Sequence, residues 1–301
     1  MSGHLALVGP TASGKSTLAF EAARSLQDIE IVSVDSMQVY RGMDIGTAKP
    51  TAAEQAEVPH HLLDLAEPGE RFTVARFQTE ADRAIADIEA RGHRALLVGG
   101  TGLYVQAIVD RLAVPGEWPD VRAELDAEAA ATGTEGLHRR LRVVDPGAAA
   151  RIEPSNRRRV VRALEVSLGS GQPFSSFGPG IDAYPPTPFR MTGVWLPRAV
   201  LGRRIDVRLC AQVESGFVEE AQALAPRMSS TARQALGYKE LLDYTAGTCT
   251  LDEALDAAGR RTREFSRRQR MWFRRDPRIT WLATANDPLA LLPALLGNWS
   301  Q

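Results

Sequence analysis

The sequence predicts an α/β protein in which a parallel sheet, flanked by helices, is interrupted by an all-helical insertion. Short apolar runs alternate with helical patterns through the first 112 residues, and this alternation is typical of a parallel sheet with helices on both faces. Residues 113–189 show helical patterns, and an apolar run then returns. We therefore expect a discontinuous core of residues 1–112 and 190–301, and a helical insertion domain of residues 113–189.

The first half of the core contains the clearest strand and helix patterns. Apolar runs that predict buried strands lie at 4–9 and 94–100, and residues 30–35 and 60–64 predict a second and a short third strand. Helical patterns lie at 11–26, 73–92 and 101–109. In the second of these helices Phe77, Ala81, Ile85 and Ile88 share one face, which suits packing against a sheet.

Beyond the insertion, helical patterns dominate. A stretch rich in proline, glycine and serine at 172–188 predicts a loop. Strands are expected at 189–196 and near the end of the chain at 278–283. These two strands would complete the sheet that the first half of the chain begins.

The composition is that of an ordinary globular protein. The chain has 301 residues, of which 44% are hydrophobic and 24% charged, and its net charge is −1. No apolar run approaches the roughly eighteen residues of a membrane span, and the N-terminus lacks the zones of a signal peptide. The two cysteines, Cys210 and Cys249, form no metal-ligand pattern. We expect a cytoplasmic protein without membrane contact.

A phosphate-binding loop follows the first predicted strand. Residues 9–16 read GPTASGKS, which fits G-x-x-x-x-G-K-[ST] between a strand and a helix. The backbone N–H groups of such a loop, together with the helix N-terminus, converge on an anion. Lys15 would neutralise phosphate oxygens, and the Ser16 hydroxyl would ligate Mg²⁺. The residues of this cradle are Gly9, Pro10, Thr11, Ala12, Ser13, Gly14, Lys15 and Ser16. The core is therefore expected to be P-loop NTPase-like.

The loop specifies a di- or triphosphate but no reaction. Proteins that hydrolyse nucleotides usually carry an acidic residue at the end of a second core strand. Here the strand at 94–100 runs into Gly99, Gly100, Thr101 and Gly102. This second glycine-rich turn argues against a GTPase or a motor, and it leaves a small-molecule kinase open.

Asp35 is expected at the same edge of the sheet as the cradle. It follows the strand at 30–35, and ligands bind at the carboxyl edge of a parallel sheet. It could be a metal ligand, a partner for a ribose hydroxyl or a general base, and the alternative is that it caps a turn. Residues that could read or stack on a base follow it: Ser36, Gln38 and Tyr40. Gly42 and Gly46 suggest a loop that a ligand approaches closely.

Arginines recur at helical spacing near the C-terminus. One predicted ridge consists of Arg260, Arg263, Arg267, Arg270 and Arg274, and a neighbouring one of Arg261, Arg268 and Arg275. A second basic patch, Arg157, Arg158, Arg159 and Arg162, lies in the insertion. Arg204 and Arg208 share a helix face and could clamp a leaving phosphate or form a surface pattern with nearby acids. Two basic surfaces in a nearly neutral chain favour a large anionic partner over a merely solvated face.

Taken together, these stretches resemble the tRNA dimethylallyltransferases (tRNA isopentenyltransferases) of the bacterial type. The matching pieces, in order over about residues 3–283, are GPTASGKS, VDSMQVYRGMDIGTAKP, PHHLLD, LLVGGTGLY, RRVVRALEV, SGFVEEA, ALGYKEL and RRQRMWFRRD. The pieces DSMQVYRGMDIGTAKP and VGGTGLY are the most specific. One departure is PSNRRRVVRALE, which has Asn-Arg where the family pattern has Asn-Asp.

The resemblance implies a reaction and its residues. A dimethylallyl group would move from dimethylallyl diphosphate to the N6 amine of adenosine 37 of tRNA, beside the anticodon, with Asp35 as general base. Thr101 would hold the amine or the diphosphate, and the cradle with Mg²⁺ would bind the diphosphate. The positions that match tRNA contacts are Asp35, Ser36, Met37, Gln38, Thr101, Arg122, Arg158, Arg159, Val160, Val161, Arg162, Gln234, Ala235, Leu236, Gly237, Tyr238 and Lys239. The partners are thus the tRNA anticodon stem-loop and dimethylallyl diphosphate, and we expect a monomer.

Two alternatives remain at this point. A small-molecule kinase would share the cradle but would not need arginine-rich ridges on two separate elements. A non-catalytic RNA-binding module could use the cradle to sense a nucleotide, but it would not need the carboxylate expected at Asp35.

Overall fold

The computed structural model describes residues 3–178 and 180–299, and it divides into two compact units. The larger unit comprises residues 1–110 and 184–301, and the smaller one residues 111–183. Residues 184–189, which were expected in the insertion, thus belong to the core. The reason is local packing: the Thr187 hydroxyl donates to the Val109 carbonyl at 3.0 Å, and Phe189 is buried in the core.

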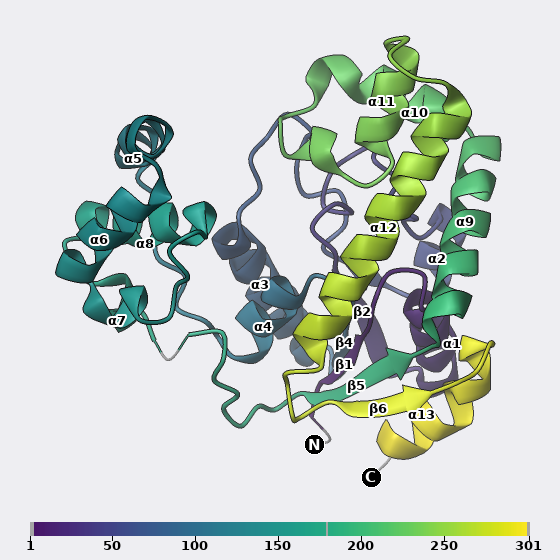
Figure 1. The fold of residues 1–301 in the computed structure, drawn as a ribbon. Helices are drawn as coiled ribbons and strands as arrows, with labels where there is room; N and C mark the ends of the chain where they lie inside the picture. Colours follow the sequence, from purple (N-terminus) through teal and green to yellow (C-terminus); the bar gives the residue numbers. More distant parts are fainter. Residues whose placement is uncertain (1–2, 179, 300–301) are drawn as a thin grey trace. The chain divides into compact units, whose positions relative to one another are not determined.

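The larger unit is built on a parallel sheet, as the sequence predicted. Among the described residues the sheet has the order β3-β2-β4-β1-β5-β6, and every pairing is parallel. The strands are β1 (Leu5–Val8), β2 (Ile29–Val34), β3 (His60–His61), β4 (Arg94–Gly99), β5 (Arg190–Trp195) and β6 (Thr280–Ala283). Strand β5, the first strand that follows the insertion in the sequence, pairs with β1. The two separated parts of the chain therefore form one sheet (Figure 1).

Helices cover both faces of this sheet because alternate strand residues point to opposite sides. The helices of the larger unit are α1 (Lys15–Leu26), α2 (Ala52–Glu57), α3 (Val74–Ala90), α4 (Gly102–Val109), α9 (Arg198–Glu214), α10 (Phe217–Leu224), α11 (Tyr238–Thr245), α12 (Leu251–Phe273) and α13 (Leu292–Trp299). Ala6 and Val8 face one core, which also contains residues of α3, α4, α10, α11 and α12. Leu5 and Leu7 face a second core, which contains residues of α1, α9 and α13.

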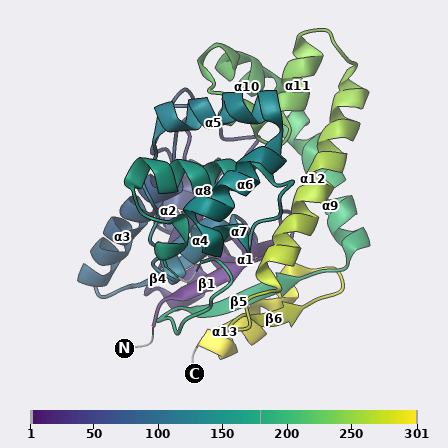
Figure 2. The ribbon, with the colours of Figure 1, turned by 60° about the vertical axis from the view of Figure 1, so that its left-hand side comes forward.

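The smaller unit is helical throughout its regular structure, as expected. Its α-helices are α5 (Pro119–Thr132), α6 (Thr134–Val144), α7 (Pro146–Ala149) and α8 (Arg157–Ser170). They enclose a core of their own that includes Leu125, Leu137, Leu141 and Leu164. Figure 2 shows α5, α6 and α8 packed together. In neither unit does the part of the chain that the structure describes contain a helix long and apolar enough to cross a membrane.

Candidate functional site

Three chain segments meet at the carboxyl edge of the sheet. In the register of the sheet, Val8 and Val34 both lie opposite Gly99. The residues that follow these three positions therefore leave the sheet side by side, and they begin the cradle, the Asp35 loop and the Thr101 turn. A Cβ atom on Gly99 would lie only 2.1 Å from the Val34 carbonyl oxygen. The close approach of β2 and β4 at this point thus requires glycine.

The cradle has the geometry of an anion-binding loop. Gly14 caps α1 in the left-handed conformation, with φ of 79° and no side-chain cap. The first N–H groups of the helix therefore have no capping side chain and face outward. Ala12 also has a left-handed φ, of 62°, a conformation that side chains other than glycine rarely adopt and that often marks functional sites. Pro288 covers Gly14, since a Cβ there would lie 2.5 Å from its ring.

Two helices from the C-terminal part of the chain hold the cradle in place. From α9, Arg204 Nε donates to the Ala12 carbonyl at 2.8 Å. From α12, the buried Gln269 accepts from the Thr11 N–H at 2.8 Å and donates to the Gly100 carbonyl at 2.9 Å. Gln269 thus ties the cradle to the turn before Thr101. Sequence reasoning missed this role of Gln269.

The cradle concentrates positive charge. Lys15 Nζ donates to the Pro10 carbonyl at 3.3 Å, and burial lowers the pKa of Lys15 to about 8, against the attraction of Asp35. Burial also lowers the pKa of Arg208, again opposed by Asp35, while Arg204 lowers it further. Arg208 Nε is buried, and no residue that the structure describes accepts a hydrogen bond from it. Half-buried cations that repel one another favour a bound anion, and a diphosphate would supply one.

The loop that begins at Asp35 contacts Thr101 beside the cradle. The Asp35 Oδ1 atom accepts hydrogen bonds from the Met37 N–H at 2.8 Å and the Gln38 N–H at 3.4 Å. The Ser36 N–H donates to Thr101 Oγ1 at 3.3 Å. Asp35 therefore does cap a turn, as one alternative held, but both capping bonds use a single carboxylate oxygen. The Thr101 hydroxyl acts as acceptor, so its own hydrogen can be donated to a ligand.

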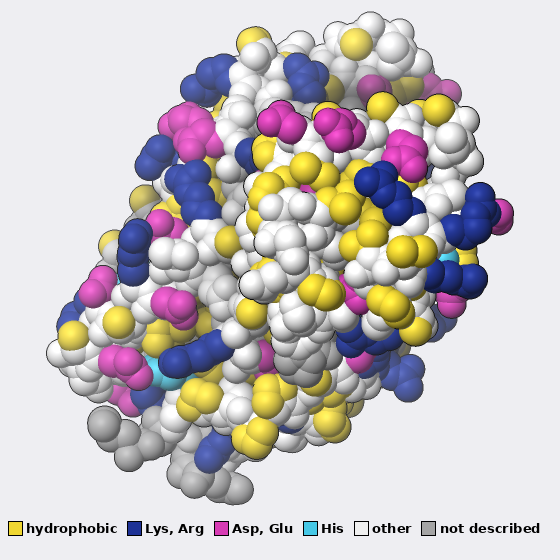
Figure 3. Space-filling model, turned by 90° about the vertical axis from the view of Figure 1, so that its left-hand side faces the viewer, with side chains coloured by type: hydrophobic (Ala, Val, Ile, Leu, Met, Phe, Trp, Pro, Cys, Tyr) yellow, Lys and Arg dark blue, Asp and Glu magenta, His cyan; other side chains and the backbone are white. Residues whose placement is uncertain are grey.

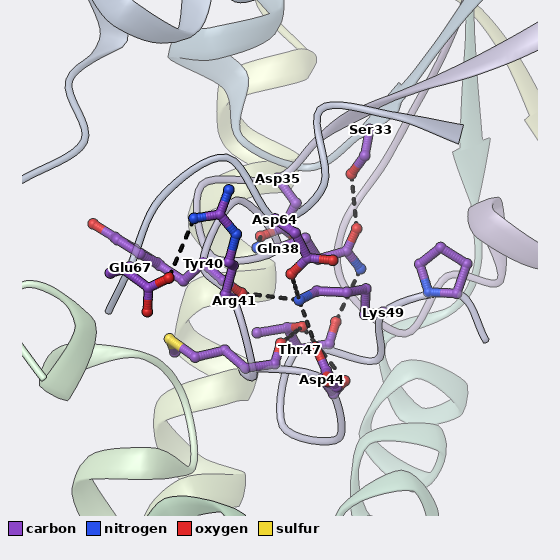
Figure 4. A network of polar contacts seen from close by, with 12 residues as sticks. Ser33, Asp35, Gln38, Tyr40, Arg41, Asp44, Thr47, Lys49, Asp64 and Glu67 are labelled. Carbon is purple, nitrogen blue, oxygen red and sulfur yellow. Dashed lines mark hydrogen bonds and ion pairs between the residues drawn. The ribbon is translucent and has the colours of Figure 1, made fainter. Parts of the chain in front are cut away.

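The loop after Asp35 folds around a buried lysine (Figure 4). The side chain of Lys49 is 3% exposed, and its ammonium contacts Asp44 at 2.5 Å and Asp64 at 2.6 Å. It also donates to the Tyr40 carbonyl at 2.9 Å. These three contacts connect Lys49 to Tyr40 and Asp44, which precede it in the sequence, and to Asp64, which follows it.

Gln38 fixes the same loop from within. Its Oε1 atom accepts from the Ser33 hydroxyl at 2.7 Å, and its Nε2 group donates to the carbonyls of Thr47 and Ala48, each at 3.1 Å. Figure 4 shows this side chain between Ser33 on one side and the Thr47 end of the loop on the other. The side-chain amide of Gln38 thus bonds the protein itself in this conformation.

Two expectations for this loop were wrong. Tyr40 is 1% exposed, and its hydroxyl donates to the Glu70 carbonyl, so its ring cannot stack on a base. Gly46 is approached closely by protein and not by a ligand. A Cβ on Gly46 would lie 2.2 Å from Phe217 and 2.5 Å from Tyr238.

The arginine ridge of α12 is only partly a surface feature. Arg260, Arg263 and Arg267 are exposed as predicted, but Arg270 is 7% exposed. It donates to the Leu196 carbonyl at 2.9 Å and lies 3.4 Å above the ring of Trp195. Its place in an RNA-facing ridge was therefore wrong, because Arg270 belongs to the buried side of this helix together with Ser266 and Phe273. Arg263, although exposed, pairs with Asp206.

The positions matched to tRNA contacts in the larger unit are of two kinds. Gln234 and Lys239 are exposed, whereas Ala235 and Tyr238 are buried in the core. Their segment is held by Arg261, which donates to the Gln234 carbonyl at 2.5 Å. Leu236 is half-buried and Gly237 is buried. Any RNA contact of the buried positions would use the backbone of this turn or follow a local rearrangement.

The smaller unit shows the same division. Arg158 and Arg159 are exposed, while Val160 and Val161 are fully buried in the unit's core. Arg122 and Arg162 form ion pairs with the same carboxylate, Glu165. The exposed first turn of α8 is therefore basic. On the face of the molecule in Figure 3, basic and acidic side chains are intermixed.

The residues at the cradle fit a magnesium ion that is held mostly by waters and phosphate oxygens and by few protein side chains. Ser16 lies in the first turn of α1 and is exposed. Among the described residues, no group of three or more His, Cys, Asp or Glu side chains could hold a metal. Mg²⁺ commonly keeps several waters and binds one or two side-chain oxygens together with phosphate oxygens. A hydroxyl beside a phosphate cradle matches that donor set.

Comparisons with known proteins decide the family. A family model described as IPP transferase matches residues 38–276. The chain is 48% identical to the tRNA dimethylallyltransferase of Kineococcus radiotolerans, over 97% of this chain and 95% of that protein. The chain belongs to the IPP transferase family.

Solved structures agree with this assignment. The full-length tRNA isopentenylpyrophosphate transferase of Bacillus halodurans is 40% identical, with a TM-score of 0.71 over 100% of this chain and 97% of that chain. A eukaryotic dimethylallyltransferase acting on tRNA is 25% identical, with a TM-score of 0.79 over 98% of this chain and 78% of that chain. The IPP transferase core of this chain therefore has the expected P-loop NTPase-like fold. The relatives' names favour transfer of a prenyl group over the kinase alternative.

Proposed function

We propose that this protein transfers a dimethylallyl group from dimethylallyl diphosphate to the N6 amine of adenosine 37 in tRNA, beside the anticodon. The observation that carries the proposal is the contact between the Ser36 N–H and Thr101 Oγ1, which joins the residue after Asp35 to Thr101 at the carboxyl edge of the sheet. A carboxylate and a hydroxyl beside an anion site are the groups that this transfer needs. The names of the relatives support the same activity.

Asp35 would act as the general base on the amine. The amine of adenine is a poor nucleophile because its lone pair is delocalised into the ring, and proton removal during bond formation is worth about 10²–10⁴-fold. The Oδ1 atom is held by two backbone N–H groups, which leaves Oδ2 to accept the proton. Thr101 would donate its hydroxyl hydrogen to the diphosphate or orient the amine.

The cradle would stabilise the leaving group. As the N6–carbon bond forms, the bond between the allylic carbon and the diphosphate oxygen breaks, and the diphosphate takes the electron pair. The positive charges of Lys15 and Arg208, which interact with Asp35 and with each other, and the N–H groups at the start of α1 would meet this developing charge. Preorganised donors of this kind are usually the largest catalytic contribution. Mg²⁺ bound by Ser16 would supply further neutralisation of the diphosphate.

The RNA would be held by exposed basic residues of both units. Arg158 and Arg159 of α8 and the exposed arginines Arg260 and Arg267 of α12 are available for phosphate contacts. The target adenosine lies in a single-stranded loop, where bases are extruded at low cost. We propose that the protein acts in the cytoplasm as a monomer.

A labelled-substrate assay tests the proposal. The protein is incubated with Mg²⁺, labelled dimethylallyl diphosphate and tRNA that carries adenosine beside the anticodon. We expect label to appear in the tRNA at that adenosine, and tRNA with guanosine at this position to remain unlabelled. Absence of transfer, together with ATP turnover on a small acceptor, would instead favour the kinase.

A further inference from the structure

One carboxylate binds three backbone amides at the tip of the loop that follows Asp35, while Gln212 of α9 donates to the carbonyls of Ile45 and Gly46 at the same tip. Glu220, on α10, accepts hydrogen bonds from the N–H groups of Asp44 at 3.0 Å, Ile45 at 2.7 Å and Gly46 at 3.0 Å. Three consecutive amides directed at one carboxylate form an anion-binding turn whose anion is a side chain of the protein. Hydrogen bonds to a charged acceptor are the stronger kind.

Glu220 also binds Tyr238, in the predicted RNA-contacting turn. The Tyr238 hydroxyl donates to Glu220 Oε1 at 2.5 Å. Burial, and then the neighbouring Glu220, raise the pKa of Tyr238 far above its ordinary value, so the hydroxyl keeps its proton and remains a donor. Glu220 therefore joins two segments that lie almost two hundred residues apart in the sequence.

Aromatic packing reinforces this junction. The rings of Phe217 and Tyr238 meet edge to face with centroids 4.8 Å apart, and Gly46 lies against both of them. A Cβ on Gly237 would lie 2.6 Å from the Phe217 ring. Glycine is therefore required on both sides of the ring pair, and the two segments cannot shift independently without opening this contact.

Hydrogen bonds, together with the short backbone stretch that joins residues 46 and 47, connect this junction to Asp35. The bonds of Glu220 fix residues 44–46. The next carbonyls along the chain, those of Thr47 and Ala48, accept from the Gln38 side chain. The Gln38 backbone N–H in turn donates to Asp35 Oδ1. The position of the Asp35 carboxylate is therefore linked to the contacts of Glu220.

We propose that Glu220 is a positioning residue: through Tyr238 and the amides of residues 44–46 it holds the Asp35 loop in register with the turn at 234–239. This inference rests on the proposed function for its catalytic meaning. Its structural content is independent of that function. When RNA contacts the turn at 234–239, the Asp35 loop is already fixed relative to it, and no loop ordering is needed at the moment of reaction.

Hydrogen–deuterium exchange and kinetics together test the proposal. Tyr238→Phe removes one donor and keeps the ring, and Glu220→Gln removes the charge that the three amides face. In both variants we expect the amides of residues 44–46 to exchange roughly tenfold faster, with the α3 amides unchanged. We expect kcat for transfer to fall by roughly tenfold, with KM for dimethylallyl diphosphate unchanged. Glu219→Gln, at the exposed neighbouring glutamate, is the matched control and should behave as the unaltered protein.

The exchange measurement and the kinetic measurement distinguish a failure of the Glu220 proposal from a failure of the proposed function. Unchanged exchange at residues 44–46 in both variants overturns the proposal, whatever the activity. Faster exchange with unchanged kcat overturns the positioning role, because the loop would then be free without consequence. If the unaltered protein transfers no label, the proposed function fails, and the exchange measurement still decides whether Glu220 holds the loop. Tyr238→Phe keeps the test valid if Glu220→Gln fails to fold.

Discussion

The side chain of Gln269 accepts a hydrogen bond from the Thr11 N–H at 2.8 Å. The same amide donates to the Gly100 carbonyl, so one residue near the C-terminus connects the cradle after β1 with the turn after β4. Glutamine suits this place because its amide offers one acceptor and one donor in a fixed geometry. The protein itself therefore uses the Thr11 N–H, and it also uses the Ser13 N–H, which donates to the Pro10 carbonyl at 3.3 Å. The uncapped N–H groups at the start of α1 remain for an anion.

Replacing Gln269 should loosen the cradle. Gln269→Met keeps the volume but leaves the Thr11 N–H and the Gly100 carbonyl unpaired in a buried place, which costs about 1–3 kcal/mol for each group. We expect a lower free energy of unfolding in urea and weaker binding of magnesium diphosphate by calorimetry. Arg267→Gln, on the exposed side of the same helix, is the control. Unchanged diphosphate affinity in the Met variant would show that the cradle keeps its shape without this link.

Removing the carboxylate of Asp35 should abolish transfer and spare tRNA binding. Asp35→Asn keeps the size of the side chain and an oxygen that can accept the Met37 N–H, but the amide cannot take up a proton at neutral pH. We expect kcat to fall by about 10²–10⁴-fold, with the tRNA dissociation constant changed by less than about threefold in a filter-binding assay. Substantial remaining activity would place the base elsewhere.

The sequence predicted the fold well because the fold depends on local patterns. The apolar runs before Gly9, Asp35 and Gly100 became neighbouring parallel strands, and this placed three candidate segments at one edge. Position along a strand is enough for such an inference, since every carboxyl end of a parallel sheet lies on the same side.

The sequence did less well wherever a role depends on tertiary partners. Arg270 and Arg261 share helical spacing with exposed arginines, yet one is buried against Trp195 and the other binds the Gln234 carbonyl. The glycine at position 46 correctly predicted that another group lies close to the backbone there, but this group is the aromatic pair Phe217 and Tyr238 and not a ligand. The local sequence around a glycine does not show whether a protein side chain or a ligand approaches it. A polar residue at a core-facing helix position, such as Gln269, indicates a buried hydrogen-bonding role, and the sequence analysis did not use this indication.

The exposed arginines of α12 should contribute to the salt dependence of tRNA binding. Removing one arginine that binds a phosphate should reduce the slope of log affinity against log salt by roughly 0.7–0.9. For Arg260→Gln combined with Arg267→Gln we expect a slope reduced by up to about twice that amount, with the free energy of unfolding unchanged. The buried Arg270 is left intact, because its replacement would break the hydrogen bond to Leu196 and confound the result. Arg83→Gln on α3, where the side chain is exposed, is the control.

If the double variant keeps the slope of the unaltered protein, α12 does not contact the phosphates. The exposed arginines of α8, Arg158 and Arg159, would then carry the electrostatic part of binding. Their replacement by glutamine in the same titration decides between the two helices.

Glu30 should give the protein a stability that is lost in acid. This carboxylate is 3% exposed and accepts from Arg91 at 2.7 and 2.9 Å, from His61 at 2.7 Å and from His93 at 2.9 Å. The hydrogen bond from Arg91, with those from the two histidines, lowers the pKa of Glu30 to about 2 against the effect of burial. The ordinary value is 4.5.

Because the pKa is lower in the folded state, the contribution of Glu30 is fully present above pH 4.5 and is lost as the pH falls towards 2. Each pKa unit is worth about 1.4 kcal/mol, so the loss over this window is on the order of 3 kcal/mol. Glu30→Gln should be less stable than the unaltered protein at pH 6 in urea, and the difference should shrink as the pH falls from 4.5 to 2.5. Glu219→Gln is the exposed control. A difference that stays constant over this range would mean that the ionised carboxylate contributes no pH-dependent stability, and that only its shape and hydrogen bonds matter.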